Sequence, residues 1–176
     1  MIFGHRQRGG PVNSVTLGVN GHLMQALELK VPPPVVALLV AAAMWGVASV
    51  TARIEMPLLV RASAALAFAI AGVGMAISGV IAFHHARTTV SPVKPDSASS
   101  LVTSGVYRFT RNPMYLGLCL VLLAWACALS SALTFLGPIF FILYINRFQI
   151  VPEETALSRM FGAAFSNYQA KVRRWL

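Results

Sequence analysis

Long apolar stretches alternate with polar ones along most of this chain. Residues 35–52 and 62–83 are almost wholly apolar, and a third apolar stretch extends from Leu116 to about Tyr144. A helix that crosses a bilayer needs about 17–25 mostly apolar residues, so each of the first two stretches predicts one span. Three consecutive prolines, residues 32–34, precede the first span and cannot continue a helix from upstream.

The third apolar stretch is too long for a single span. As one straight helix it would be about 45 Å long, against a hydrocarbon core of about 30 Å. A hairpin that turns near Ser130 and Ser131 fits better, with Gly137 and Pro138 kinking the returning helix. The pattern therefore predicts an all-α integral membrane fold with about four transmembrane helices.

The residues after the fourth span predict a helix of a different kind. Pro152 disfavours helical geometry at the residue before it, so we expect a new helix to begin there. Its apolar residues recur at the spacing of one helical face: Leu157, Met160, Phe161, Ala164, Phe165 and Tyr168. We expect this amphipathic cytoplasmic helix to lie on the membrane surface or to cover a site there.

The composition agrees with a membrane protein. Hydrophobic residues make up 57% of the 176 residues and charged residues 11%, whereas soluble domains have about 45–50% and about 25%. A soluble fold of this size could not hide so much apolar surface behind so few charges. The composition excludes a disordered protein, a secreted disulfide scaffold and an ordinary cytosolic enzyme.

Lys and Arg residues gather on one side of the predicted bundle. Twelve of the 14 lie before the first span, in the loop after the second span or after the fourth span, and four spans place these segments on one face. Only Arg53 and Arg61 lie on the other face. The positive-inside rule makes the basic face cytoplasmic. We therefore expect a protein of the inner or plasma membrane with both termini cytoplasmic, and no nucleic-acid partner.

The loop after the second span carries much of the candidate chemistry. Connections longer than about 12–15 residues are usually functional or disordered, and this one interleaves Tyr107, Phe109 and Tyr115 with arginines, which argues against disorder. No group of His, Cys, Asp and Glu has the spacing of metal ligands, so we expect no metal site.

The charged residues after the fourth span have ordinary structural explanations as well. Glu153 and Glu154 lie in the first turn of the predicted helix, where carboxylates complement the helix dipole. Arg147 lies near the membrane boundary, where a long basic side chain can reach the interface.

Two motifs in the second half of the chain resemble those of a known family. Residues 101–117, Leu-Val-Thr-Ser-Gly-Val-Tyr-Arg-Phe-Thr-Arg-Asn-Pro-Met-Tyr-Leu-Gly, resemble a motif of the isoprenylcysteine carboxyl methyltransferases. The later pattern is similar to that family's C-terminal signature: Pro152-Glu153-Glu154, Leu157, Phe161-Gly162, Tyr168 and Val172-Arg173-Arg174-Trp175. The match is specific for the wider superfamily of membrane methyltransferases, which includes phospholipid N-methyltransferases, and much less specific for a substrate.

The resemblance implies a membrane methyltransferase that uses S-adenosylmethionine without a Rossmann domain. It implies a cofactor pocket with these lining residues: Leu101, Val102, Gly105, Tyr107, Arg111, Asn112, Pro113 and Tyr115. Glu153 or Glu154 would take the amino group of the cofactor through a charge-assisted hydrogen bond. Arg147 matches an arginine near the end of the family's last span and would hold an anionic substrate, so Arg147 and Glu154 are the candidate catalytic residues.

The resemblance also suggests how the chain is organised. Residues 1–34 would form an N-terminal cytoplasmic extension, residues 35–83 the first two transmembrane helices, and residues 84–176 the methyltransferase core. We expect the cytoplasmic loop and the C-terminal helix of this core to close together over one cofactor site.

The acceptor is expected to be a lipophilic small molecule or a lipid-linked group, most simply a carboxylate. A carboxylate needs no general base, whereas an amine with a pKa near 10 does. A phospholipid-type N-methyltransferase is the alternative within this class. Two other classes stay open, a relative of the NADPH-dependent membrane reductases and a non-catalytic membrane subunit that binds a partner or membrane lipid. The oligomeric state is left open.

The chain departs from the eukaryotic prenylcysteine enzymes at two positions. It has Ser99 and Asn112 where those enzymes have histidines. These differences argue against a prenylated protein as the substrate.

Overall fold

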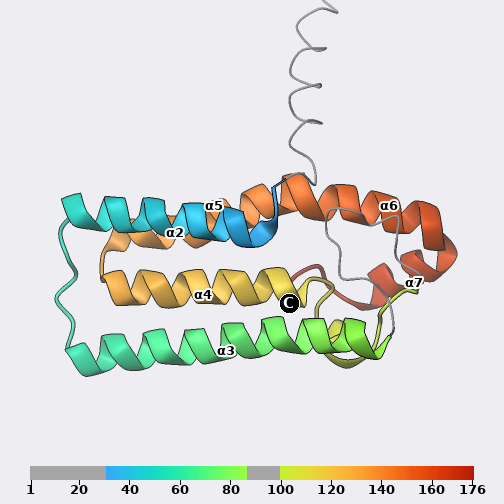
Figure 1. Cartoon of the computed structure of the whole chain (residues 1–176), viewed down its shortest axis with the longest axis horizontal. Coiled ribbons are helices and arrows are strands. Elements are labelled where there is room, and N and C mark those ends of the chain that lie inside the picture. Colours follow the sequence, from blue (N-terminus) through green and yellow to red (C-terminus); the bar gives the residue numbers. More distant parts are fainter. Residues whose placement is uncertain (1–30, 87–99) are drawn as a thin grey trace, which may run out of the picture.

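The computed structural model describes residues 31–86 and 100–176, and every regular element in these two ranges is helical (Figure 1). The longer helices are α2 (Pro33–Val50), α3 (Leu58–His85), α4 (Pro113–Leu129), α5 (Leu136–Ile145), α6 (Val151–Phe161) and α7 (Ala163–Lys171). The short helical turns are η2 (Gly105–Arg108), η3 (Ala132–Phe135) and η4 (Asn146–Ile150).

Three helical runs in the described residues are long and apolar enough to cross a membrane. They are α2, α3 and the continuous run Ala132–Phe161, and α4 is a shorter apolar helix of 17 residues. The predicted all-α membrane fold is confirmed. Large apolar side chains such as Leu38, Leu66 and Leu143 are exposed on the outer faces of these helices, where a bilayer would cover them.

Helix α4 lies in the middle of the bundle. It packs against α3 on one side and against α2 and α5 on the other (Figure 1). Its residues Cys119, Leu122 and Ala126 are buried in one core with Val40 of α2 and Phe141 of α5. Because α4 is enclosed by its neighbours, the helix with the fewest residues for a span is also the one with the least contact with lipid.

Two glycines set the distance between α3 and α4. A Cβ atom on Gly117 would lie 2.6 Å from the carbonyl oxygen of Gly72, and one on Gly72 would lie 2.7 Å from the carbonyl oxygen of Gly117. The two backbones therefore meet directly, as membrane helices do where small residues face each other. This contact holds the start of α4, and with it the loop that precedes α4, against α3.

The α4–α5 hairpin turns at Ser130 and Ser131, as predicted. Ser130 adopts a left-handed conformation with a φ of 54°. Its hydroxyl donates to the carbonyl oxygen of Ile54 at 2.9 Å, and the backbone N–H of Ile54 donates to the Ser130 carbonyl at 2.6 Å. The hydroxyls of Thr51 and Ser131 lie 2.8 Å apart. These bonds join the two helix connections at this end of the bundle.

Gly137 and Pro138 are predicted to kink the helix that returns from the hairpin. They lie in the first turn of α5, where η3 gives way to the α-helix, and a proline there interrupts no intrahelical hydrogen bond. Gly137 serves packing instead, since a Cβ atom on it would lie 2.6 Å from Cγ of Met44. Helices α2 and α5 approach each other closely at this point.

The predicted helix break before Pro152 is wrong. Val151 has helical angles, with a φ of −62° and a ψ of −47°, and α5, η4 and α6 form one continuous run. The turn η4 is a π-helix. A π turn bonds each N–H to the carbonyl five residues earlier and is wider than an α turn, which makes room for a proline that lacks an N–H donor.

The single amphipathic helix expected after Pro152 is divided in two. Gly162 has a φ of 51°, ends α6 and precedes α7. Of the predicted apolar face, Phe165 and Tyr168 are buried, whereas Met160 and Ala164 are exposed. A residue with positive φ cannot continue a right-handed helix, so the two halves of the predicted face point in different directions.

We predict that Gly117→Ala destabilises the protein. The added methyl group would force the α3 and α4 backbones apart, at a cost of about 1–3 kcal/mol and roughly 3–10 °C in the unfolding temperature. The measurement is thermal unfolding of the protein in detergent. Gly74→Ala is the matched control, because a Cβ atom on Gly74 meets nothing within 4 Å. Equal unfolding temperatures for the two variants would contradict the packing role of Gly117.

Candidate active site

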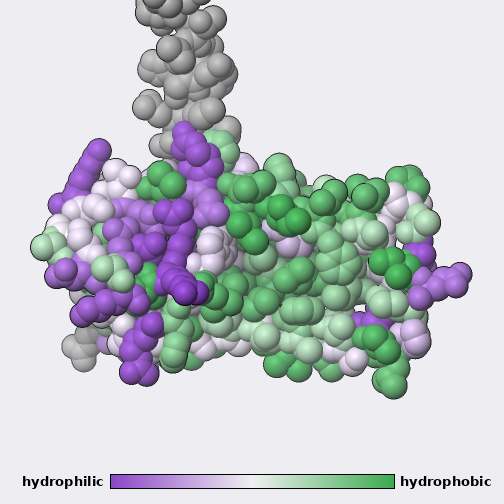
Figure 2. All heavy atoms as spheres, turned by 180° about the vertical axis from the view of Figure 1, so that it is seen from behind, coloured by the Kyte–Doolittle hydropathy of each residue, from purple (hydrophilic) through white to green (hydrophobic). Residues whose placement is uncertain are grey.

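Hydrophilic residues gather at one end of the bundle (Figure 2). This end is formed by the loop that leads into α4, by α6 and α7, and by residues 172–176, which we call the C-terminal strap (Figure 1). The other end carries only short helix connections. The polar end is therefore where side chains of the described segments can act on a water-soluble cofactor.

Glu154 of α6 is held by two arginines from distant parts of the chain. Nη2 of Arg111 lies 3.3 Å from its Oε1 atom. Arg174 of the strap approaches in a bidentate manner, with Nε donating to Oε1 at 3.1 Å and Nη2 donating to Oε2 at 2.6 Å. Charge-assisted pairs of this geometry are among the stronger hydrogen bonds in proteins. We call residues 110–115, which lead into and begin α4, the α4 entrance. The carboxylate of Glu154 thus joins the α4 entrance, α6 and the strap.

The guanidinium of Arg111 keeps unused hydrogen-bonding capacity. Its Nε and Nη1 atoms are buried, and neither has a hydrogen-bond partner among the described residues. Buried donors without partners are rare in folded proteins. Each of these atoms can donate to a partner from outside these segments, on a different edge of the guanidinium.

Glu153, the neighbouring acid, points to a different partner. The hydroxyl of Tyr115, in the first turn of α4, donates to Oε1 of Glu153. Two successive carboxylates of α6 are therefore both engaged with the α4 entrance, one through Tyr115 and the other through Arg111.

The C-terminal strap lies along the α4 entrance. The backbone N–H of Arg111 donates to the carbonyl of Arg173 at 3.0 Å. The carbonyl of Arg174 accepts from Nδ2 of Asn112 at 2.9 Å and from the hydroxyl of Thr110 at 3.3 Å. Residues 110–112 of the loop therefore lie against the strap that follows α7, and the predicted closing of the loop and the C-terminal helix over one cofactor site stays a prediction.

The end of the strap is also tied to η4. Nε1 of Trp175 donates to Oδ1 of Asn146 at 3.2 Å. The sequence pattern left Arg174 and Trp175 without a role in the site, although both belong to the C-terminal signature. In the structure the end of this signature, residues 172–175, belongs to the strap that closes over the α4 entrance.

Two tyrosines fasten η2 to α7 and α3. The ring of Tyr107 is buried and packs edge-on against Phe83, with ring centroids 5.4 Å apart. Its carbonyl accepts from the hydroxyl of Tyr168 at 2.7 Å. Burial raises the pKa of Tyr107, and it raises the pKa of Tyr168 to about 12, against a smaller lowering by Arg111. Both phenols therefore stay neutral at physiological pH, and Tyr168 remains a hydrogen-bond donor.

The remaining predicted pocket residues lie in the segment that leads into α4 and at its first position. Val102 is buried against Ala82 of α3, and Leu101 is half-buried beside it in the chain. Gly105 begins η2 with a φ of 61°, a conformation that glycine adopts without steric cost. Pro113 is buried as the first residue of α4, where it lacks only an N–H that the helix does not use. Ser99 lies outside the described residues.

Arg147 lies in the π turn η4, before the two glutamates. Its side chain is exposed, and its guanidinium lies 5.4 Å from the centroid of the Phe148 ring. A cation over an aromatic face is attracted to the negative charge on that face. Because η4 connects the apolar α5 to α6 with its two glutamates, Arg147 lies at the junction of the apolar and polar parts of the long helix.

Comparison with known proteins now decides the family. The model of the family described as "Phospholipid methyltransferase" matches residues 60–164, which is more than half of the chain. The chain belongs to this family. It is a membrane methyltransferase.

A shorter relative is also found. The chain is 56% identical over 63 residues to a curated protein of Haemophilus influenzae that is named only as an uncharacterized protein. The matched region is 36% of this chain and the whole of that protein. No solved structure gives a significant match.

Arg111, Tyr115, Glu153, Glu154 and Arg174 form one polar cluster. The part matched to the phospholipid methyltransferase family contains most of it. It includes Arg111, Tyr115 and both glutamates, whereas Arg174 lies beyond it. Methyltransferases of this family generally use S-adenosylmethionine. The roles assigned to individual residues and the division of the chain at residue 84 stay predictions.

We predict that Arg174→Ala loosens the C-terminal strap. The variant loses both hydrogen bonds to Glu154, and hydrogen bonds to charged groups contribute about 1.5–3 kcal/mol. The amide of Arg111, which donates to the strap, should then exchange its hydrogen roughly tenfold faster. Hydrogen–deuterium exchange of the peptide that contains it is the measurement.

Arg173→Ala is the matched control for the strap. Its side chain is exposed, and alanine keeps the backbone carbonyl that accepts from Arg111. Exchange that rises equally in both variants would show that the Arg174–Glu154 pair does not hold the strap.

Proposed function

We propose that the protein transfers a methyl group from S-adenosylmethionine to a lipophilic or lipid-linked acceptor at the polar end of the bundle. The observation that carries this proposal is the guanidinium of Arg111, which has two buried donor atoms without described partners beside the carboxylate of Glu154. Membership of a methyltransferase family supports the reaction type.

The amino-acid end of S-adenosylmethionine fits this cluster. That end carries a carboxylate and an ammonium group side by side, and the cluster offers a cation and a carboxylate side by side. Nη1 of Arg111 would donate to the carboxylate, and Glu154 or Glu153 would accept from the ammonium group. When bound, the cofactor supplies a methyl group already activated on a sulfonium.

The charges of the cluster agree with a zwitterion. Arg111 carries a positive charge and Glu154 a negative one, 3.3 Å apart. This pair would hold a group with one charge of each sign without a surplus. Nearby charges of opposite sign also reduce the free-energy cost of withdrawing each group from water.

The remaining residues would act by positioning. Methyl transfer from a sulfonium is a displacement, and the protein accelerates it chiefly by aligning the two reactants and excluding water. Tyr107 and Tyr168 fix η2 against α7, and the strap fixes the α4 entrance. These contacts would give the cofactor rigid walls on the water-facing side.

A carboxylate acceptor agrees best with the engaged state of both glutamates. Glu154 is paired with two arginines and Glu153 accepts from Tyr115, so neither is a free base. A carboxylate nucleophile needs no base. Arg147, exposed at the junction of the apolar and polar parts, would attract such an anionic head group.

A phospholipid amine is the second candidate, and the description of the matched family favours it. An amine with a pKa near 10 must lose a proton before it can attack. Glu153 would then serve as the base, with Tyr115 orienting its carboxylate.

We predict that Arg111→Ala abolishes measurable binding of S-adenosylmethionine. Loss of one partner of a desolvated charge pair costs about 2–5 kcal/mol, which is a weakening of roughly 30-fold or more. Glu154→Gln should weaken binding in the same way. Isothermal titration calorimetry of the protein in lipid nanodiscs, with the demethylated cofactor as second ligand, measures both effects.

Arg108→Ala is the control for this binding experiment. Its side chain is exposed and lies over the ring of Phe109, at 5.8 Å from the centroid, so its loss should leave the affinity unchanged. Wild-type protein that takes up neither ligand would refute the proposed function.

We predict that the transferred methyl group is released by mild base. The product of a carboxylate acceptor is a methyl ester, which base hydrolyses, whereas an N-methyl group is stable. Membranes containing the protein are incubated with S-adenosylmethionine labelled in the methyl group, and volatile methanol is counted after alkali. Label that stays non-volatile after alkali would show that the acceptor is an amine and not a carboxylate.

A further inference from the structure

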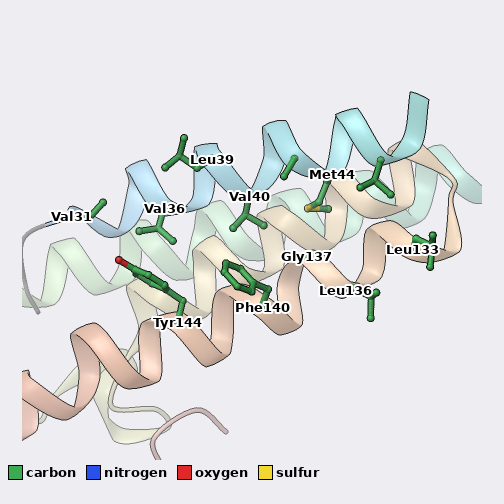
Figure 3. A pocket seen from close by; sticks show the side chains of 12 residues that line it. Val31, Val36, Leu39, Val40, Met44, Leu133, Leu136, Gly137, Phe140 and Tyr144 are labelled. Carbon is green, nitrogen blue, oxygen red and sulfur yellow. The ribbon is translucent and has the colours of Figure 1, made fainter. Parts of the chain in front are cut away.

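A groove runs along the membrane-facing side of the bundle between α2 and α5 (Figure 3). Its volume is about 510 Å³. From α2 and the residue before the prolines come Val31, Val36, Leu39, Val40, Ala43, Met44 and Val47, and from η3 and α5 come Leu133, Leu136, Gly137, Phe140 and Tyr144. In Figure 3 the rings of Phe140 and Tyr144 point toward α2.

The lining suits hydrocarbon. Of the lining side chains, only that of Tyr144 carries a polar atom able to donate a hydrogen bond, so a polar occupant would lose its hydrogen bonds to water without replacement. Both walls belong to helical runs that are long and apolar enough to cross a membrane. The groove is therefore open to an occupant that comes from the bilayer.

The dimensions fit a single lipid chain. From Val36 to Val47 the groove follows α2 for about 17 Å, and one leaflet of a hydrocarbon core is about 15 Å thick. The groove is therefore about as long as one hydrocarbon chain within a single leaflet.

The groove is continuous with the polar end. Val31 and Tyr144 lie at the end nearest α6 (Figure 3), and the carbonyl of Val31 accepts from Nε2 of Gln149 at 2.8 Å. Gln149 precedes Glu153 by about one helical turn. Its side chain is 1% exposed, and its Oε1 atom has no hydrogen-bond partner among the described residues. An unsatisfied acceptor thus lies where the apolar lining ends and the polar cluster begins.

We propose that this groove holds one hydrocarbon chain of the methyl acceptor, with the polar head of the acceptor at the Val31–Tyr144 end. The inference rests on the proposed function, since the acceptor is the molecule that must meet the cofactor near Glu153 and Glu154. A chain in the groove would bring its head group to that end without leaving the bilayer. Binding of the chain would supply the affinity, and the polar end would select the head group.

The test uses photolabelling of the protein in phosphatidylcholine vesicles. The probe is hexadecanoic acid with a photoactivatable diazirine in mid-chain, and labelled peptides are identified by mass spectrometry. Leu39→Trp and Leu136→Trp add bulk to the two walls. Leu38→Trp and Leu143→Trp are the matched controls, because both leucines are exposed on the same helices but do not line the groove.

We expect wild-type protein to be labelled on α2 and α5 at the groove, and excess hexadecanoic acid to suppress this labelling. The two groove variants should lose at least fivefold of the labelling and of the methyl transfer from labelled S-adenosylmethionine, whereas the two controls keep both. Labelling that is equal in all variants, or that no competitor reduces, would overturn the proposal and indicate ordinary bilayer lipid. Cross-links between two copies of the protein through groove residues would also overturn the proposal and indicate that a second copy occupies the groove.

Binding of S-adenosylmethionine by the same preparations separates this inference from the proposed function. Groove variants that keep cofactor affinity but lose labelling and transfer support the inference. Wild-type protein whose labelling is suppressed by hexadecanoic acid, but which binds no cofactor, would refute the proposed function. The hydrocarbon in the groove would then not belong to a methyl acceptor. Full methyl transfer by the groove variants, with cofactor binding intact, would refute the proposed role of the groove but not the proposed function.

Discussion

Glu154 holds together three parts of the chain that the sequence separates widely. Its carboxylate meets Arg111 at the α4 entrance and Arg174 in the C-terminal strap. Removing any one of these partners leaves an unpaired charge at a half-buried position. The loss of stability is then larger than the net stabilisation that the ion pair itself provides. The walls of the candidate site therefore depend on one another.

The bundle supplies the frame on which this ion network is built. Because α4 is enclosed by α2, α3 and α5, its first turn is fixed in all directions. The direct backbone contact at Gly72 and Gly117 sets the position of that turn relative to α3. Arg111 and Tyr115 lie just before Gly117 in the chain, so helix packing in the apolar part determines where two polar groups of the site lie.

The sequence predicts the parts that follow from local rules and misses those that depend on distant contacts. Apolar length is enough to find the spans, and Ser130 and Ser131 mark the hairpin because polar residues interrupt an apolar run. The family motifs bring Arg111 and Glu154 into one hypothesis. The contacts of the strap have no comparable local signal, since its five residues show no periodicity and its partners Thr110 and Asn112 lie about 60 positions away.

The two local rules that fail do so for definable reasons. A proline normally marks a helix boundary, but the wider turn η4 accommodates Pro152 within a continuous helix. The spacing of apolar residues after Pro152 suggests one long helix, but the positive φ of Gly162 changes the direction of the chain. Periodicity reports which residues share a face only while the backbone conformation stays the same.

The π turn at Asn146–Ile150 also has a consequence for the direction of α6. An α-helix advances about 100° for each residue, and a π turn contains one residue more than an α turn. The segment beyond it is therefore rotated by about that angle relative to an uninterrupted helix, and this rotation determines which way the two adjacent acids face. A regular α turn here, with every residue of the chain kept, would turn the two carboxylates away from their basic partners.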